Sequence, residues 1–180
     1  MSAMPLVCFV GVLALLYRRA TRRKWKALVA NFRFTRIIYY LLFLTFGAYV
    51  GIATGTELLS GLSLADTLTF LALALAVVFG WLFSVWENDE VDQEIDRISN
   101  PGRPKITGVF SEQEWTEQKW TFLTLSLIAA SIAGWYALTF IVLFLFIYHA
   151  YSCAPLRLKR VPVLSSVLVG VQGLLITLAG

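Results

Sequence analysis

The sequence predicts an all-α protein, a multi-pass transmembrane helical bundle. Of its 180 residues, 58% are hydrophobic and only 14% are charged. The mean hydropathy of +0.74 is typical of integral membrane proteins. Apolar runs alternate with shorter polar connections, and we interpret about five of these runs as membrane spans. Composition and patterning together therefore place the chain in a lipid bilayer.

The amino-terminal segment differs from the rest of the chain, and we divide the sequence into residues 1–36 and 37–180. Residues 4–17 form an apolar run that is too short to cross a bilayer comfortably. No positive residue precedes this run and no small-residue cleavage pattern follows it, which argues against a cleaved signal peptide. We interpret the run as an anchor or an extra helix.

The next segment, residues 18–36, is strongly basic. Its apolar residues recur at helical spacing, which predicts a helix that lies on an anionic membrane surface. A nucleic-acid patch is the alternative, but the neighbouring apolar runs argue against it, so we expect no nucleic-acid partner. The apolar residues of this helix are Trp25, Leu28, Val29 and Phe32.

Residues 37–180 contain the predicted spans. A polar turn with Glu57 and Asp66 separates the first two of them. The apolar stretch 120–151 is too long for one crossing and is interrupted at Gly134, so we predict two short spans joined there. Ser111 is predicted to begin the helix that leads into this stretch, with Glu114 completing a capping box. The spans are expected at residues 37–53, 68–86, the two halves of 120–151, and 163–180.

The positive charges support this layout. All fifteen Lys and Arg residues lie in three connections, eight in residues 18–36, four in 87–119 and three in 151–160. The alternate connections, around residues 54–66 and 133–135, contain none. The positive-inside rule therefore places the three basic connections on the cytoplasmic side. A block of acidic residues, 86–97, would then share that side with the basic loop 151–160.

The acidic block comes directly after the second predicted span. On a continuous helix, Asp89, Asp92 and Asp96 fall within roughly 60° of one another, and the glutamates of the block fall on the other side. Carboxylates this close repel unless a cation lies among them. Their short oxygen ligands suit Mg²⁺, which commonly also takes phosphate oxygens. The alternative is a solvated acidic loop. Basic residues available for the rest of a diphosphate's charge are Arg97, Arg103 and Lys105.

Two motifs in the predicted cytoplasmic loops indicate a family. The pattern Asn-Asp-x-x-Asp-x-x-x-Asp covers residues 88–96, and the pattern Tyr-Ser-x-x-Pro-x-Arg-Leu-Lys-Arg covers residues 151–160. In this order and in these loops they resemble the UbiA superfamily of intramembrane prenyltransferases, over roughly residues 35–180. The first motif is followed, as is common in that family, by Arg97, Asn100, Arg103, Pro104 and Gly108.

The resemblance implies a function. It is Mg²⁺-dependent transfer of an isoprenyl chain from an isoprenyl diphosphate to a hydrophobic, aromatic or lipid acceptor within the bilayer. Asp89, Asp92 and Asp96 would be the catalytic residues that bind Mg²⁺ and the donor diphosphate. Departure of the diphosphate leaves an allylic cation, so metal and guanidinium groups must stabilise the developing negative charge. The resemblance implies these further substrate-binding residues: Asn88, Arg97, Arg103, Tyr151, Arg157 and Lys159.

One feature departs from the family pattern. Family members carry a second aspartate cluster in a later loop, but no aspartate follows Asp96 here, and only part of the larger UbiA-like bundle is present. We therefore expect one of three situations: a truncated product, half of a site that a second chain completes, or a non-catalytic scaffold or partner subunit that retains the first motif. A soluble isoprenyl diphosphate synthase is a further hypothesis, and the apolar spans argue against it.

Cysteine and histidine are not expected to contribute a site. Cys8 and Cys153 are far apart, with neither a CxxC spacing nor a disulfide framework. The single histidine, His149, lies near the end of an apolar run. We expect His149 to be a packed or interfacial residue, because one histidine without partners does not bind a metal ion.

Overall fold

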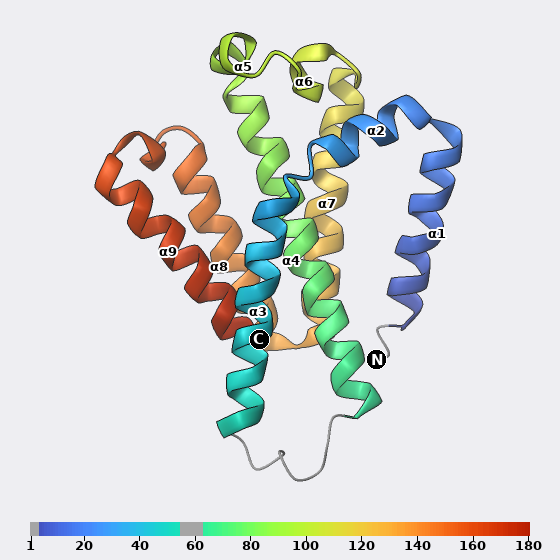
Figure 1. Ribbon diagram of the computed structural model, residues 1–180, viewed down its shortest axis with the longest axis vertical. Helices are drawn as coiled ribbons and strands as arrows, with labels where there is room; N and C mark the ends of the chain where they lie inside the picture. Colours follow the sequence, from blue (N-terminus) through green and yellow to red (C-terminus); the bar gives the residue numbers. More distant parts are fainter. Residues whose placement is uncertain (1–3, 55–62) are drawn as a thin grey trace.

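The computed structural model describes residues 4–54 and 63–180, and all regular secondary structure in these ranges is helical. Long helices lie side by side, and short helices cap one end of the bundle (Figure 1). The predicted all-α, multi-pass fold class is confirmed. The helices are α1 (Met4–Ala20), α2 (Arg22–Ala30), α3 (Phe34–Thr54), α4 (Leu64–Val91), α5 (Gln93–Ser99), α6 (Pro104–Thr107), α7 (Glu112–Ala133), α8 (Trp135–Ser152), a 3₁₀ turn (Leu158–Arg160) and α9 (Pro162–Ala179).

Four of the described helices, α3, α4, α8 and α9, are long and apolar enough to cross a membrane. The fifth predicted span lies in the second half of α7, which has a polar first half and is not among the described helices that are long and apolar enough to cross a membrane. Ser111 and Glu114 form the predicted capping box at its start. Gly134 separates α7 from α8 as predicted, with a backbone φ of +127° that residues with a side chain rarely adopt. Glu57 lies outside the described residues.

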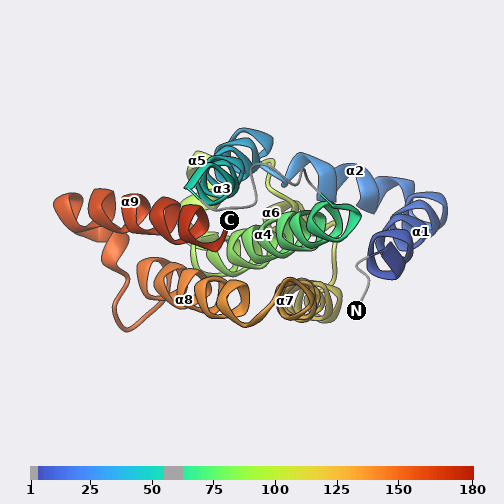
Figure 2. The same ribbon diagram turned by 90° about the horizontal axis from the view of Figure 1, so that it is seen from below.

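Helix α4 is the centre of the bundle. In Figure 2 it lies between α3 on one side and α7 and α8 on the other. In its most apolar window 61% of the residues are buried, against 33% or less in α3, α8 and α9. The Ser126 hydroxyl of α7 donates to the Ala76 carbonyl of α4 at 2.8 Å, and the Trp86 and Trp115 rings stack 5.0 Å apart. Packing of α4 on its neighbours therefore fixes the position of its carboxyl end, where the acidic block begins.

The basic amino-terminal segment packs onto this bundle. Helix α2 runs across the ends of the long helices (Figure 1), and its Leu28 is part of the buried core. The Trp81 indole of α4 donates to the Phe32 carbonyl at 3.1 Å, which fixes the turn between α2 and α3 against α4. The apolar face predicted for membrane contact thus contributes in part to protein packing. The division at residue 36 and the surface location stay predictions.

Gly47 allows α3 and α9 to touch. A Cβ atom at Gly47 would lie 1.9 Å from the Thr177 carbonyl oxygen, whereas at Gly51 it would meet nothing within 4 Å. We expect Gly47→Ala to push the helices apart and to destabilise the fold by about 1–3 kcal/mol, the usual effect of overpacking. Thermal unfolding in detergent measures this, with Gly51→Ala as the matched control. Equal midpoints for the two variants would contradict the close approach.

Candidate functional site

Three connections meet at one end of the bundle (Figure 1). They are the turn between α2 and α3, the segment from the end of α4 through α5 and α6, and the loop between α8 and α9. These segments belong to the three basic connections of the sequence, and each provides side chains that bind the acidic block. The acidic block and the basic loop 151–160 therefore lie together. Their cytoplasmic location stays a prediction.

Asp89 lies in the last turn of α4 and its side chain has no exposed surface. Its Oδ1 atom accepts hydrogen bonds from Arg33 and from Arg103 Nη1, the latter at 2.6 Å. Its Oδ2 atom accepts one from Asn31 Nδ2 at 2.9 Å. A buried carboxylate is stable only when paired and hydrogen-bonded in this way. Two of these partners come from the α2–α3 turn, far from Asp89 in sequence.

Asp96, on α5, is joined to Asp89 through one guanidinium. Arg103 Nη1 donates to Asp96 Oδ2 at 2.5 Å as well as to Asp89. The Asn100 amide donates to Asp96 Oδ1 at 3.0 Å. The side chains that pair with these two carboxylates, rather than the carboxylates themselves, line a cleft of about 320 Å³. The cleft is lined by Ala30, Asn31, Arg33, Asn100, Gly102, Arg103 and Pro104.

Asp92 belongs to a second, neighbouring network. Arg157 Nη2 donates to its Oδ1 at 2.6 Å, and Lys159 Nζ donates to its Oδ2 at 2.5 Å. Lys159 also donates to Asn88 Oδ1 at 2.9 Å, which accepts from the Ser152 hydroxyl at 3.1 Å. Partial burial raises the pKa of the Asp92 carboxyl, but the hydrogen bonds from Lys159 and Arg157 outweigh it and hold that pKa below its usual range.

The single aspartate stripe expected on a continuous helix is not found. Helix α4 ends at Val91 and α5 begins at Gln93, with Asp92 between them at φ −96° and ψ 14°. The change of direction places Asp89 and Asp96 in one network and Asp92 in the other. The physical reason is pairing, since Arg103 orients both Asp89 and Asp96, whereas Arg157 and Lys159 of the α8–α9 loop orient Asp92.

Two predicted binding residues and one nearby lysine do not join these networks. Arg97 is exposed and makes no ion pair with the described aspartates. Tyr151 is half-buried and packs against the Tyr148 ring, with centroids 5.9 Å apart. Lys105 pairs with Glu112 at 2.5 Å instead. Their proposed contacts with a diphosphate therefore have no support from this geometry.

The glutamates of the acidic block face elsewhere, as the helical spacing predicts. Glu90 pairs with Lys119 of α7 at 2.5 Å. Glu87 binds His149 of α8 at 2.9 Å, and Glu94 is exposed. The glutamates thus bind side chains of neighbouring helices or face outward. They take no part in the two aspartate networks.

Asn31 and Arg33 are the site residues that sequence reasoning missed. They lie outside both motifs, in a segment identified only as basic and amphipathic. The one local signal is an asparagine directly after an amphipathic helical run, which is typical of a helix end. Nothing in the sequence predicts that the turn contacts Asp89, which is more than fifty residues away.

Arg33 provides a test of that contact. Arg33→Gln should weaken binding of an isoprenyl diphosphate by about tenfold, because one charged hydrogen-bond donor beside the cleft is lost. Arg36→Gln is the matched control, since Arg36 is exposed and three residues further along. Titration of the donor into both variants in detergent measures the effect. The same affinity in both would show that the α2–α3 turn takes no part in the site.

Comparisons with known proteins agree with the helical arrangement. A family model described as the UbiA prenyltransferase family matches residues 45–180. A solved structure from a study called "Structural and mechanistic insights into the biosynthesis of Digeranylgeranylglyceryl phosphate synthase in membranes" is similar, with a TM-score of 0.72 and 21% sequence identity. The match covers 87% of this chain and 52% of that chain, so this chain spans about half its length. No curated protein sequence matches significantly.

Proposed function

The chain belongs to the UbiA prenyltransferase family and is an integral membrane protein, and from this premise we propose that its two aspartate networks bind Mg²⁺ together with an isoprenyl diphosphate. The bound donor would pass its isoprenyl chain to a hydrophobic or aromatic acceptor within the bilayer. The observation that carries the proposal is the ion-pair arrangement around Asp89, Asp92 and Asp96, with Arg103 beside a cleft of suitable size.

The ligand set suits Mg²⁺. Carboxylate oxygens are the hard ligands that this ion prefers. Asp89 provides them from the last turn of α4, Asp92 from the junction that follows, and Asp96 from α5. Each of these carboxylates is held by a cationic side chain of the chain itself. Three aspartates form ion pairs with four cationic side chains, so these two networks together carry an excess positive charge that favours binding of an anion. The cations are Arg33, Arg103, Arg157 and Lys159.

This arrangement implies an exchange of partners. In the donor complex, the aspartates would hold the metal ion, and the four cations would turn from the aspartates to the phosphate oxygens. Mg²⁺, when bound, supplies Lewis-acid stabilisation of the charge on the diphosphate. Arg33 and Arg103 would bind this group from the cleft, and Arg157 and Lys159 from the α8–α9 loop. Together they stabilise the charge that develops as the bond between isoprenyl carbon and diphosphate oxygen breaks.

The rest of the reaction depends on the surrounding apolar surface. Helices α3, α4, α8 and α9 provide an apolar setting for a lipid tail and keep water from the allylic cation. A second aspartate motif, expected from the family, would come from further sequence or from a second chain.

A non-catalytic role is the second candidate function. The observation that favours it is that Asp89, Asp92 and Asp96 are all neutralised by side chains of the same chain. In a scaffold or partner subunit these ion pairs would be permanent and would hold the three connections together. The two candidates differ in one measurable property, which is the response of the site to Mg²⁺.

Calorimetry on the full chain in detergent separates them. Farnesyl diphosphate is titrated into the protein with Mg²⁺ and again with a chelator, and geraniol serves as a control for lipid partition. The proposed function predicts saturable binding that requires the metal ion, with competition by inorganic pyrophosphate. Binding that is indifferent to Mg²⁺, or no binding, would contradict the proposal and favour a structural role.

A further inference from the structure

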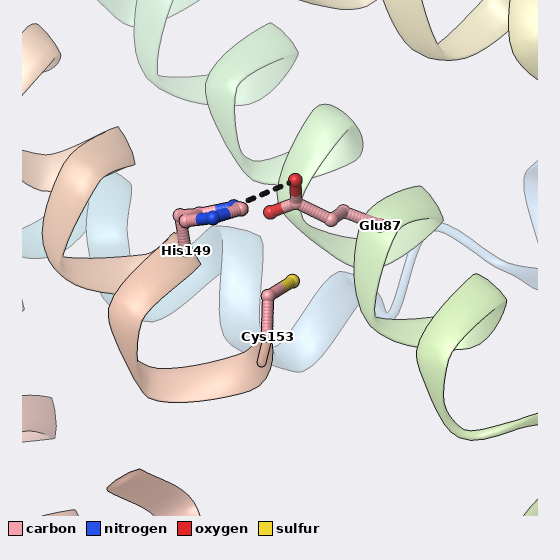
Figure 3. Close-up of side chains that lie close together, drawn as sticks. All are labelled: Glu87, His149 and Cys153. Atoms are coloured by element: carbon pink, nitrogen blue, oxygen red, sulfur yellow. Dashed lines mark hydrogen bonds and ion pairs between the residues drawn. The ribbon is translucent and has the colours of Figure 1, made fainter. Parts of the chain in front are cut away.

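Three side chains with metal-binding atoms gather beside the aspartate networks: Glu87, His149 and Cys153 (Figure 3). His149 and Cys153 are four residues apart at the end of α8 and so lie on one face. Glu87 reaches them from α4, and its Oε1 atom lies 2.9 Å from His149 Nδ1. One ligand atom from each residue lies within 4.8 Å of the others. His149 thus has neighbours with metal-binding atoms, which the sequence alone did not indicate.

We propose that Glu87, His149 and Cys153 bind a divalent transition-metal ion, with Zn²⁺ the best match, at a site separate from the aspartates. One oxygen, one imidazole nitrogen and one sulfur ligand suit Zn²⁺, and three protein ligands plus a water complete its usual tetrahedron. Thiolate and imidazole disfavour Mg²⁺, which prefers oxygen ligands. The two sites of this end of the bundle would thus select different ions by their chemistry.

An unsatisfied atom supports this proposal. Glu87 Oε2 is buried and, among the described residues, makes no hydrogen bond of normal geometry; its near neighbour is the Cys153 thiol, a weak donor. A buried carboxylate oxygen without a partner is unfavourable, and a metal ion beside it would remove that cost. The cluster is also not sealed, because the His149 side chain is 53% exposed. Solvent can therefore reach the cluster and supply the fourth ligand.

The geometry needs only a small adjustment. Tetrahedral ligands at zinc distances are about 3.5 Å apart, so the widest separation has to shrink from at most 4.8 Å. Rotation of the exposed His149 ring can provide much of this change. Burial and the Glu87 carboxylate raise the pKa of the Cys153 thiol to about 12. Zinc binding therefore breaks the S–H bond, forms the S–Zn bond and releases the proton to solvent.

An ion bound by Glu87, His149 and Cys153 would hold the end of α4 against the end of α8. Glu87 precedes Asn88, and Cys153 follows Ser152, whose hydroxyl donates to Asn88. An ion held by α4 and α8 would therefore fix the start of the loop that carries Lys159, which pairs with Asp92. This role does not depend on the prenyl transfer proposed above, since it concerns only the positions of two helix ends.

Metal retention by the full chain tests the proposal. The protein is purified with a tag that lacks histidine, stripped of metal, and dialysed against Zn²⁺ with excess Mg²⁺. Co²⁺ is used in parallel, because thiolate binding to it gives a charge-transfer absorption band. We expect about one zinc ion per chain and the cobalt band. His149→Ala and Cys153→Ser should abolish the band and weaken zinc binding by about tenfold or more.

The controls separate this site from other sources of zinc. Cys8→Ser removes the other cysteine, which is exposed, and should bind zinc as the unchanged chain does. In that background zinc should slow alkylation of Cys153, and His149→Ala should remove the protection. His149→Ala changes an exposed side chain, so this variant should fold normally and its zinc binding can be compared directly with that of the unchanged chain. Three results would each overturn the proposal. They are unchanged zinc binding in both ligand variants, loss of zinc only in Asp92→Asn, and no zinc retained by the unchanged chain.

Discussion

Asp89→Asn is expected to weaken Mg²⁺-dependent binding of farnesyl diphosphate by about 100-fold, or ~3 kcal/mol, the scale measured when one partner of a buried charge pair is removed. The asparagine keeps the shape of the side chain but cannot neutralise Arg33 and Arg103, and it is a poorer ligand for the metal ion. Calorimetry in detergent measures the loss. If Asp89→Asn bound the donor as tightly as the unchanged chain, this carboxylate would not be part of the site.

Folding and binding can be told apart in this experiment. Asp89 is fully buried, so its substitution also lowers stability, and thermal unfolding is recorded for each variant. Asp92→Asn changes a side chain that is 14% exposed and is the second test of the same claim. Glu94→Gln is the matched control in the same acidic block, because Glu94 is exposed. We expect large losses of binding for both aspartate variants and none for the control.

The double variant Arg157→Gln and Lys159→Gln is expected to weaken donor binding by about 30-fold, because two charged donors to the diphosphate are lost together. Single substitutions should have smaller effects, and added salt should reduce the difference between the variants. Arg160→Gln is the matched control from the same loop, since Arg160 is exposed. Donor affinity measured at two ionic strengths tests this, and an effect as large in Arg160→Gln would show that the charges act without specific contacts.

The same double variant changes the dependence of stability on pH. In the unchanged chain the pKa of Asp92 lies below its ordinary value of 3.8, so its contribution to stability is present at neutral pH and is lost progressively as the pH falls through that ordinary value toward the lowered one. Without the two cations, burial remains and raises that pKa. At neutral pH the ionised, unpaired Asp92 then destabilises the metal-free variant, and protonation of this carboxyl relieves that cost as the pH falls from about 7 to 4, so the variant should gain stability relative to the unchanged chain over this range. Parallel curves would contradict the role of Arg157 and Lys159.

Much of the fold could be predicted from the sequence, because lipid imposes simple rules. Apolar runs predict spans, and turn chemistry predicts the capping box at Ser111 and the junction at Gly134. Helix α7 begins where the capping box predicts, but its polar first half keeps it from being one of the helices apolar enough to cross a membrane. Trp86 and Trp115 lie near span ends, where interfacial anchoring is expected, but they are buried in a stacked pair.

The site could be predicted only in part. Motif spacing identifies the aspartates and the Arg157–Lys159 pair, and the structure places these two groups in contact. The interruption of the helix at Asp92 has no glycine or proline to signal it. The contacts of Asn31 and Arg33 with Asp89, and of Glu87 with His149, join distant segments. Helical periodicity is a local property, so it cannot predict pairs of this kind.

The central claim is that the aspartates exchange their cationic partners for metal when a diphosphate binds. A structure of the chain with Mg²⁺ and a non-hydrolysable isoprenyl thiodiphosphate tests it most directly. We predict metal ions on Asp89, Asp92 and Asp96, with the Arg33, Arg103, Arg157 and Lys159 side chains moved onto the phosphate oxygens. A ligand bound elsewhere, with every aspartate still in its present ion pair, would contradict it.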